Sequence, residues 1–346
     1  MNILAETIEI SDTRALAVKP LVSVYMLAYR HEKFITEAIE GVIAQQCDFP
    51  LELIIGEDYS PDNTRAIVID YQQRYPQLIR VLTADRNIGI IANAARSIAA
   101  LRGKYVAICE GDDYWHHPRK LQIQVDAMRA DKSITLCHTD FDRRIGDRIS
   151  RSVYAHNPPE YLAKDDAYYN LLHRWSVITA TSVYRADVMR QFMQSRFNRP
   201  DWPFGDYNKA LFASTQGRVL YLPISTATWR KVPGSAGNSG LRSKLRLAIA
   251  GMECREEFLH AYPLPSDVAK EIRCYCYNRL MRDAFIIGDS KLHTQCRDKL
   301  KSYACYVNEI KFIMQSLVIK SMLPHMLFHA TYGAYDRIVN TNLARR

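Results

Sequence analysis

The stretch that decides the fold is residues 105–120, which read YVAICEGDDYWHHPRK. Its first five residues form an apolar run typical of a buried strand. Two adjacent carboxylates, Asp112 and Asp113, follow this strand, and Pro118 then fits the first turn of a helix. Carboxylates at this position can hold Mg²⁺ or Mn²⁺ against a diphosphate, because these cations prefer oxygen ligands and share them with phosphates. The alternative is a solvated acidic turn that caps the next helix.

Strand and helix signals alternate on both sides of this stretch. The strands are predicted at residues 21–27, 51–55, 79–82, 105–109 and 134–137, and the helices at residues 33–46, 62–74, 92–101 and 118–128. This order predicts an α/β fold with a mostly parallel sheet and helices on both faces. Ligands of such sheets bind at the carboxyl ends of the strands, so polar residues after each strand are the first candidates for a site.

The second half of the chain predicts further elements and a domain boundary. A strand at 178–183, helices at 186–195 and 207–214 and a strand at 219–222 come first. The segment 234–240, GSAGNSG, predicts a flexible linker. After it the pattern is helical, at about 241–260, 266–287, 291–320 and on to 340. We therefore expect an N-terminal extension at 1–20, an α/β domain at 21–234 and a helical region at 241–346.

Composition and charge restrict the class of protein. The 346 residues are 48% hydrophobic and 24% charged, which is ordinary for a globular protein. The formal net charge is +9, and residues 241–346 hold 17 Lys or Arg against 10 Asp or Glu. A basic region of this kind indicates an anionic partner: nucleic acid, a membrane surface or a polyanionic acceptor.

The eight cysteines include no C-x-x-C pair, so we expect no metal cluster, and reduced, mostly buried thiols in a cytosolic protein. Residues 1–20 lack the continuous apolar core of a signal peptide. The apolar stretch 312–328 is interrupted by polar residues and is a poor transmembrane helix. Neither a P-loop nor a dinucleotide-binding glycine motif is present, so ATP hydrolysis and dinucleotide redox chemistry lack support.

Five short motifs occur in a fixed order between residues 21 and 234. They are AYRHE (28–32), IGEDYSPDNT (55–64), NIG with a later Asn (87–89 and 93), EGDDYW with a later KL (110–115 and 120–121) and GDY (205–207). In this order and at these spacings, the chain resembles the inverting family 2 glycosyltransferases of the GT-A fold, of the bacterial surface-polysaccharide type. The resemblance implies a nucleotide-diphospho-sugar transferase with a C-terminal helical subdomain.

The resemblance assigns donor-binding roles to residues after the first three strands. Asp58 would accept a hydrogen bond from the base of the donor, which is uracil in a UDP-sugar, and the alternative is a helix cap. Ala28 and Tyr29 would line the nucleoside pocket. The loop beside the ribose and diphosphate, or else an ordinary turn, would be shaped by Asn87 and Gly89, with Asn93 among the donor-binding residues.

The resemblance also assigns the metal and sugar sites. Asp113 would bind Mn²⁺ or Mg²⁺ directly, and Asp112 would lie near the ribose or a metal-bound water. Trp115 would form a wall of the sugar pocket or pack in the core. Arg230 is retained from a motif that often ends in His, but Val232 occupies that His position here, which puts a third protein ligand in doubt. Arg230 would meet the diphosphate as a cation, or else remain a solvated loop charge.

Asp206 is the candidate general base. A carboxylate within hydrogen-bond reach can take the proton of an acceptor hydroxyl as the new bond forms. The alternative is an N-cap for the helix predicted at 207–214.

The function expected from the resemblance is transfer of a sugar to a glycan or lipid-linked acceptor in the synthesis of a cell-surface polysaccharide. We expect a cytoplasmic location, at the inner face of the cytoplasmic membrane if residues 241–346 contact anionic lipid. Lys311, Lys320 and Arg337 would lie at the rim of that contact. The other readings of this region are a helical subdomain packed on the catalytic domain or an oligomer contact.

Two other functions are considered. A sugar nucleotidyltransferase should carry a glycine-rich loop after the first strand, and residues 28–31 contain no glycine. A non-catalytic glycan- or nucleic-acid-binding protein would have little reason to keep Asp58, Asp113 and Asp206 together, so nucleic acid is the least favoured partner.

Overall fold

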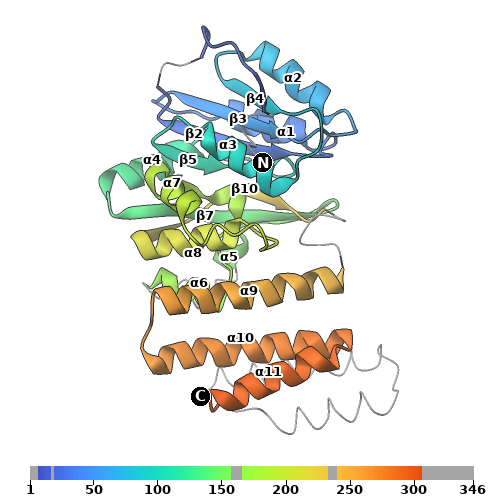
Figure 1. Ribbon diagram of the computed structural model, residues 1–346. Helices are drawn as coiled ribbons and strands as arrows, with labels where there is room; N and C mark the ends of the chain where they lie inside the picture. Colours follow the sequence, from blue (N-terminus) through green and yellow to red (C-terminus); the bar gives the residue numbers. More distant parts are fainter. Residues whose placement is uncertain (1–6, 17–18, 157–165, 233–239, 306–346) are drawn as a thin grey trace. The chain divides into compact units, whose positions relative to one another are not determined.

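A computed structural model describes residues 7–16, 19–156, 166–232 and 240–305 (Figure 1). The chain divides into two compact units, residues 1–262 and 263–346. The helix predicted at 291–320 ends at Ser302, within the described residues, whereas the last predicted helix and the three rim residues Lys311, Lys320 and Arg337 lie outside them.

The first unit contains all the strands of the described chain. These are β1 (Ile8–Ile10), β2 (Val22–Ala28), β3 (Leu51–Glu57), β4 (Ile79–Thr83), β5 (Tyr105–Ile108), β6 (Tyr114–Trp115), β7 (Ile134–Ile145), β8 (Arg148–Ser150), β9 (Val183–Arg185) and β10 (Arg218–Arg230). Its helices are α1 (Ile35–Ile43), α2 (Thr64–Arg74), α3 (Ile90–Ala99), α4 (Lys120–Ala130), α5 (Val153–His156), α6 (Ala167–His173), the 3₁₀ helix η3 (Thr179–Thr181), α7 (Ala186–Gln194), α8 (Asp206–Gln216) and α9 (Leu241–Ala261).

The strands form one mixed sheet in the order β1-β4-β3-β2-β5-β9-β7-β10-β6, with β8 paired to β7 (Figure 1). Strands β4, β3, β2 and β5 are mutually parallel, β7 and β10 are parallel to each other, and β9 is antiparallel to both of its neighbours. The predicted α/β fold is confirmed. Because Ala28 pairs with Glu57, the loops after β2 and β3 leave the sheet side by side.

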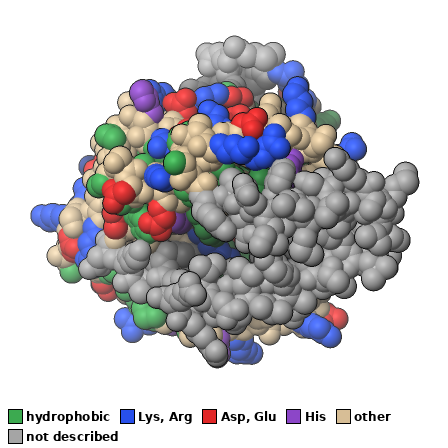
Figure 2. All heavy atoms as spheres, turned by 90° about the horizontal axis from the view of Figure 1, so that it is seen from below, with side chains coloured by type: hydrophobic (Ala, Val, Ile, Leu, Met, Phe, Trp, Pro, Cys, Tyr) green, Lys and Arg blue, Asp and Glu red, His purple; other side chains and the backbone are tan. Residues whose placement is uncertain are grey.

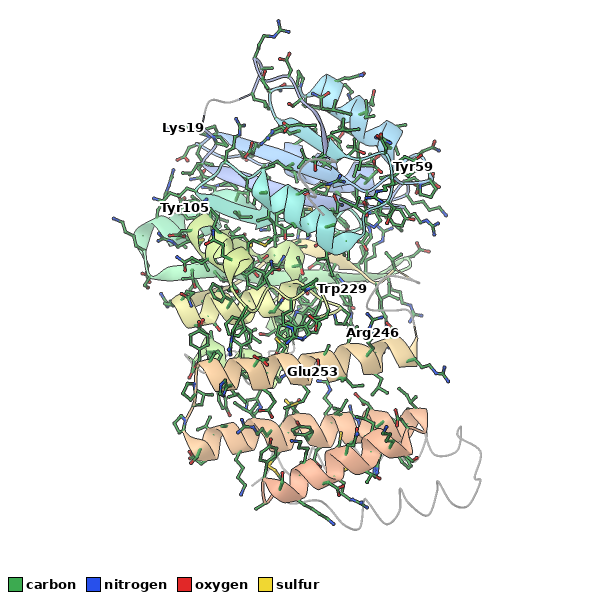
Figure 3. The ribbon with its side chains drawn as sticks, viewed as in Figure 1. Lys19, Tyr59, Tyr105, Trp229, Arg246 and Glu253 are labelled. Atoms are coloured by element: carbon green, nitrogen blue, oxygen red, sulfur yellow. A yellow bond between two sulfur atoms is a disulfide. The ribbon has the colours of Figure 1, made fainter. Side chains whose placement is uncertain are left out.

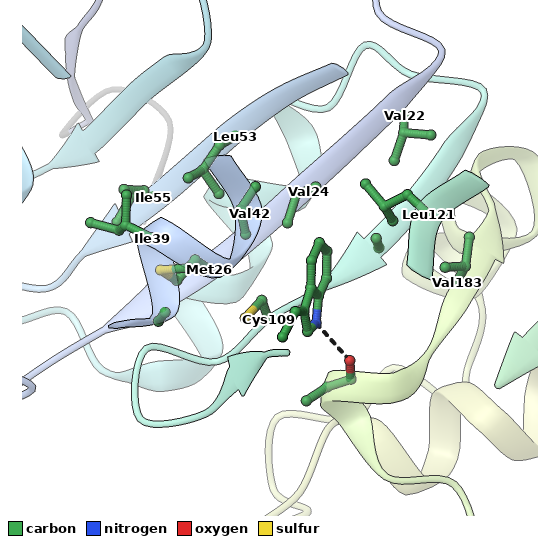
Figure 4. Close-up of a cluster of buried hydrophobic side chains, with 14 of the residues drawn as sticks. Val22, Val24, Met26, Ile39, Val42, Leu53, Ile55, Cys109, Leu121 and Val183 are labelled. Carbon is green, nitrogen blue, oxygen red and sulfur yellow. Dashed lines mark hydrogen bonds between the residues drawn. The ribbon is translucent and has the colours of Figure 1, made fainter. Parts of the chain in front are cut away.

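A hydrophobic core lies between the sheet and helices α1, α2 and α4 (Figure 4). Helix α1 shows why these segments are helical: its buried residues Ile35, Ala38, Ile39 and Val42 follow the spacing of one helix face. Gly41, on the same helix, lies against β6. A Cβ atom at Gly41 would be 2.6 Å from the backbone oxygen of Trp115, so the close approach of α1 to β6 requires glycine here.

The predicted strand at 178–183 is wrong in its first part. Residues 179–181 form η3, and the strand β9 begins at Val183. The hydroxyl of Thr181 donates to the carbonyl of Ile178 (2.7 Å), and that of Ser182 donates to the carbonyl of Thr179 (2.7 Å). These local bonds compete with sheet pairing and explain the turn.

The boundary between the units also differs from the prediction, because α9 belongs to the first unit rather than to a separate helical region. The ring of Phe258 on α9 stacks on Phe197, with centroids 4.0 Å apart. Arg255 Nε donates to the carbonyl of Leu172 (2.6 Å). The unit therefore ends after Tyr262 and not at the glycine-rich segment.

The N-terminal residues likewise join the sheet. Strand β1 pairs antiparallel with β4, and the guanidinium of Arg80 on β4 binds the carboxylates of Glu9 and Glu52 (2.8 and 3.1 Å). The buried guanidinium of Arg80 therefore links β1, through Glu9, and β3, through Glu52, to β4.

The second unit, described from Pro263 to Cys305, contains α10 (Ser266–Ile287) and α11 (Ser290–Ser302). Cys274 and Cys305 form a disulfide, so the expectation that all eight cysteines are reduced is wrong for these two. That pairing joins residues 31 positions apart, which spacing along the chain does not reveal. Among the described residues, no helix is long and apolar enough to cross a membrane.

Candidate active site

The carboxyl ends of β2, β3 and β4 meet around Asp58, which is 3% exposed. Its two carboxylate oxygens accept hydrogen bonds from the backbone N–H groups of Ile88 (2.8 Å) and Gly89 (2.9 Å). The side chain of Asn87 donates to the backbone oxygen of Asp58 (2.9 Å). Asp58 therefore holds the loop between β4 and α3 in place. This role differs from the helix cap that was the alternative prediction.

Gly89 is the residue of that loop that must be glycine, because its φ is +86° and it directly precedes α3. Asn93, one turn into α3, is 2% exposed. Its amide donates to the carbonyl of Gly56 (2.7 Å), and its oxygen accepts from Arg96 Nε (2.9 Å). The structure therefore places Asn93 behind the loop, where it fixes α3 against β3, and a contact with a donor stays a prediction.

The loops that follow β2 and β3 carry exposed aromatic side chains. Ala28 is buried at the end of β2, whereas Tyr29 is exposed and has the Arg30 guanidinium 5.3 Å from its ring centroid. Arg30 and Tyr59 both have a positive φ, of 60° and 55°. Tyr59 follows Asp58 directly and is labelled at this edge of the sheet in Figure 3. Positive φ at two bulky residues is strain of the kind found at ligand sites, and no sequence pattern predicted it.

The acidic turn, residues 110–113 between β5 and β6, is held in place by Arg230 at the end of β10. Asp113 Oδ1 accepts a hydrogen bond from the backbone N–H of Arg230 (2.8 Å), and the Arg230 guanidinium donates to the carbonyl of Asp112 (2.9 Å). The same guanidinium pairs with Glu37 and lies 4.4 Å from the ring centroid of Tyr114. Arg230 is therefore not a solvated loop charge, and its contact with a diphosphate stays a prediction. Arg230 locks the turn that carries Asp112 and Asp113.

Negative charge is crowded in this turn. Burial, and then the neighbouring charge of Asp112, raise the pKa of Asp113 well above its usual range. Burial and the charge of Asp112 also raise the pKa of Glu110 to about 8, the charge of Lys209 opposes this rise, and the charge of Asp206 adds to it. A cation bound in the turn would relieve this repulsion.

The donor set of the turn fits a hard divalent cation but does not enclose one. Asp113 Oδ2 accepts no hydrogen bond within the described part of the chain, and Asp112 is half-buried. The described residues contain no group of three or more His, Cys, Asp or Glu side chains arranged to hold a metal. Oxygen ligands that are too few to fill a coordination sphere suit Mg²⁺ or Mn²⁺ shared with a diphosphate.

Trp115 packs in the core, the second of its two predicted placements. It is 3% exposed, and its Nε1 donates to the carbonyl of Ala180 (2.8 Å). The ammonium of Lys120 lies 4.6 Å from the centroid of its ring. Trp115 therefore anchors β6, the strand that directly follows the acidic turn, in the core.

Asp206 is the first residue of α8, and the N-cap position belongs to Gly205. Asp206 Oδ2 accepts a hydrogen bond from the hydroxyl of Thr179 on η3 (2.9 Å), and Oδ1 accepts from the backbone N–H of Tyr207 (3.0 Å). Burial raises the pKa of Asp206, and the positive charge of Lys209 opposes that rise. Lys209 is itself buried, and its ammonium donates to the hydroxyl of Tyr25 on β2 (2.8 Å).

Glu37, Thr179 and Lys209 were missed from the sequence. Glu37 and Thr179 each contact a predicted site residue from another element, through the pairs Glu37–Arg230 and Thr179–Asp206, which are 193 and 27 residues apart. Lys209 lies on α8 with Asp206 and binds Tyr25, 184 residues away. Glu110 could have been identified from the sequence, because it is the first polar residue after the apolar strand at 105–109.

The comparisons with known proteins agree with this geometry. Residues 23–191 match the model of Glycosyl transferase family 2. An uncharacterised protein of Mycobacterium tuberculosis is 34% identical over 60% of this chain and 58% of its own length. A putative teichuronic acid biosynthesis glycosyltransferase, TuaG of Bacillus subtilis, is 30% identical over 44% of this chain and 59% of its own length. The matches therefore span less than two thirds of either relative.

A solved structure shares the fold. It is the mannosyltransferase PcManGT of Pyrobaculum calidifontis in complex with GDP-Man and Mn²⁺, with a TM-score of 0.58 and 14% identity over 94% of this chain and 88% of that one. The sheet and this structural likeness define a GT-A fold. The sequence likeness to glycosyl transferase family 2 covers residues 23–191.

Proposed function

We propose that this chain transfers a sugar from a nucleoside-diphosphate sugar to a saccharide acceptor in a single displacement that inverts the anomeric carbon. The observation that carries the proposal is the placement of Asp206. Its half-buried carboxylate accepts a hydrogen bond from the hydroxyl of Thr179 at the start of α8, and its charge contributes to the raised pKa of Glu110, after burial and the charge of Asp112. A single displacement needs a base and a site for the leaving group on opposite sides of one carbon.

Asp206 is the base. It accepts the proton of the acceptor hydroxyl while that oxygen forms its bond to the anomeric carbon and the bond to the diphosphate breaks. Because burial raises its pKa, the carboxylate takes a proton more readily than an exposed aspartate does. Thr179 fixes the orientation of the carboxylate, and Lys209 favours its ionised form.

Asp113, through Oδ2, and Asp112 would hold Mn²⁺ or Mg²⁺ at the acidic turn. When bound, the cation offsets the charge that develops on the departing diphosphate. Arg230 and Glu37 keep the turn in place by their mutual ion pair and by the hydrogen bonds from Arg230 to Asp112 and Asp113.

Asp58, Tyr29 and the loop at 87–89 would bind the nucleoside of the donor. Uracil is the favoured base on the residue pattern, while the structural relative PcManGT is complexed with GDP-Man. Both bases therefore enter the test below.

The acceptor is a glycan or a lipid-linked saccharide of a cell-surface polysaccharide. The relative named for teichuronic acid biosynthesis supports this class of acceptor. We place the enzyme in the cytoplasm, with the basic region 241–346 as its contact with anionic lipid at the inner face of the membrane. Figure 2 shows basic, acidic and hydrophobic side chains mixed over the coloured part of one face.

The test is calorimetric binding of UDP, GDP, TDP and CMP, with Mn²⁺ and with a chelator. One nucleotide should bind tightly only with the metal, and Asp113→Asn should abolish that difference. Absence of binding by all four would contradict the donor site and favour the non-catalytic alternative.

Asp206→Asn should leave nucleotide binding within about twofold of wild type and lower kcat by a factor of about 10² to 10⁴, the usual contribution of a general base. The measurement is transfer at saturating donor, and Asp201→Asn, an exposed aspartate on the preceding loop, is the matched control. Near wild-type turnover in Asp206→Asn would show that another group is the base.

A further inference from the structure

An exposed tryptophan, Trp175, packs against Tyr207, the residue that follows the proposed base. Its ring centroid is 5.3 Å from that of Tyr207 and 5.9 Å from that of Phe204. Tyr207 follows Asp206 directly in α8. Thr179, which donates to Asp206 Oδ2, comes only four residues after Trp175. Two observations therefore indicate that this indole lies near Asp206. Its ring packs on Tyr207, and its segment carries Thr179, whose hydroxyl binds the carboxylate.

The indole is held in a fixed orientation. Its Nε1 donates to the carbonyl of Val177 (3.2 Å), and the carbonyl of the intervening Ser176 accepts from the hydroxyl of Tyr154 (2.9 Å). Ser176 and Val177 are each 4% exposed, whereas Trp175 is 38% exposed. Since the N–H is bonded within its own segment, the surface left to solvent is mainly ring carbon. A rigid aromatic side chain of this kind binds a ligand with little loss of conformational entropy.

The other tryptophans show that this exposure is particular to Trp175. Trp115 and Trp202 are 3% and 1% exposed, and Trp229 is partly buried. Trp202 belongs to the same aromatic cluster, with its ring centroid 6.0 Å from that of Phe204. It therefore provides a buried indole to compare with the exposed one.

A pyranose ring has hydroxyls around its edge and C–H groups on its faces. Its apolar face can cover exposed aromatic carbon while its hydroxyls point to the side, which is how a mostly apolar site gains specificity from a few polar groups. A sugar stacked on Trp175 would present its hydroxyls in the direction of Asp206, the group that needs one of them.

We propose that Trp175 is the platform on which the acceptor saccharide stacks, so that one acceptor hydroxyl lies against the Asp206 carboxylate. The proposal rests on the proposed function, because it takes Asp206 as the base. It goes beyond that function by assigning a binding subsite and its ligand class, a pyranose of the acceptor.

The experiment is saturation-transfer difference NMR on the full chain with three probes: methyl β-glucoside, methyl N-acetyl-β-glucosaminide and methyl β-glucuronide. Trp175→Ala should weaken the probe that binds wild type by about tenfold, the effect of losing about 1.4 kcal/mol of stacking. Trp175→Phe should retain most of the binding. Trp202→Phe should bind the probe like wild type.

Calorimetry with the best-binding nucleotide and Mn²⁺ separates this role from a structural one. Trp175→Ala should bind that nucleotide like wild type and keep the melting temperature of Trp175→Phe. Joint loss of nucleotide and saccharide binding with a lower melting temperature would overturn the proposal in favour of a structural role.

Three further results would overturn the proposal. They are equal probe affinity in Trp175→Ala and wild type, absence of saturation of all three probes by wild type, and displacement of the probe by UDP-N-acetylglucosamine or GDP-mannose, which would place it in the donor site. Failure of the proposed function is distinguishable. It would show as turnover in Asp206→Asn, whatever the probes do at Trp175.

Discussion

His138 is a buried side chain whose burial disfavours its protonated form. It lies on β7, is 3% exposed and has its ring centroid 5.2 Å from that of Tyr221. Burial lowers its pKa to about 4. Its Nδ1 has no hydrogen-bond partner among the described residues.

Acid should therefore destabilise the protein through His138. Above pH 6.5 the residue is neutral in both states, but between pH 6.5 and 4 only the unfolded chain takes the proton. The free energy of unfolding should fall by up to about 3 kcal/mol over that range from this residue alone. Chemical denaturation at several pH values measures it. His138→Phe should remove this component, and the exposed His260→Phe should retain it.

Among the elements, the pair α10 and α11 is closed by the disulfide between Cys274 and Cys305. A crosslink over 31 residues restricts the unfolded chain, and its loss costs about 2–4 kcal/mol in typical cases. Cys274→Ser should therefore increase hydrogen exchange in α10 and α11. The buried Cys296→Ser, outside the disulfide, is the matched control. Equal exchange in Cys274→Ser and wild type would show that helix packing alone holds this unit.

Local sequence signals identified the central elements of the sheet and failed at the pairings between distant segments. Strands β2, β3 and β5 were predictable because parallel strands buried on both faces are continuous apolar runs. The two-residue strand β6 was not, because it exists only through its pairing with β10. For the same reason the sequence indicated Asp112, Asp113 and Asp206 as candidates but not Thr179 or Glu37, which bind Asp206 and Arg230 from other elements. Arg230 and Asn93 were recognised as site residues, yet what their side chains contact depends on the tertiary structure.

At the scale of the whole chain, two truncations should behave oppositely. A chain that ends after Tyr262 keeps α9, whose Phe258 covers Phe197, and should remain monodisperse in size-exclusion chromatography. A chain that ends after Gly240 exposes that aromatic surface and loses the hydrogen bond from Arg255 to Leu172, so it should aggregate. Solubility of the shorter chain would contradict the assignment of α9 to the first unit.

The close contact of Gly41 with β6 predicts that mutations at this position impair the protein. Gly41 lies on α1, four residues after Glu37, and has no role in the chemistry itself, but it touches the backbone of the strand that begins one residue after Asp113. Alanine at this position cannot fit unless that strand shifts, and the shift would carry the acidic turn with it. A random mutagenesis screen for loss of the proposed sugar transfer should therefore recover Gly41 alleles beside those of the acidic residues. Their second-site suppressors should map to the contact between helix and strand.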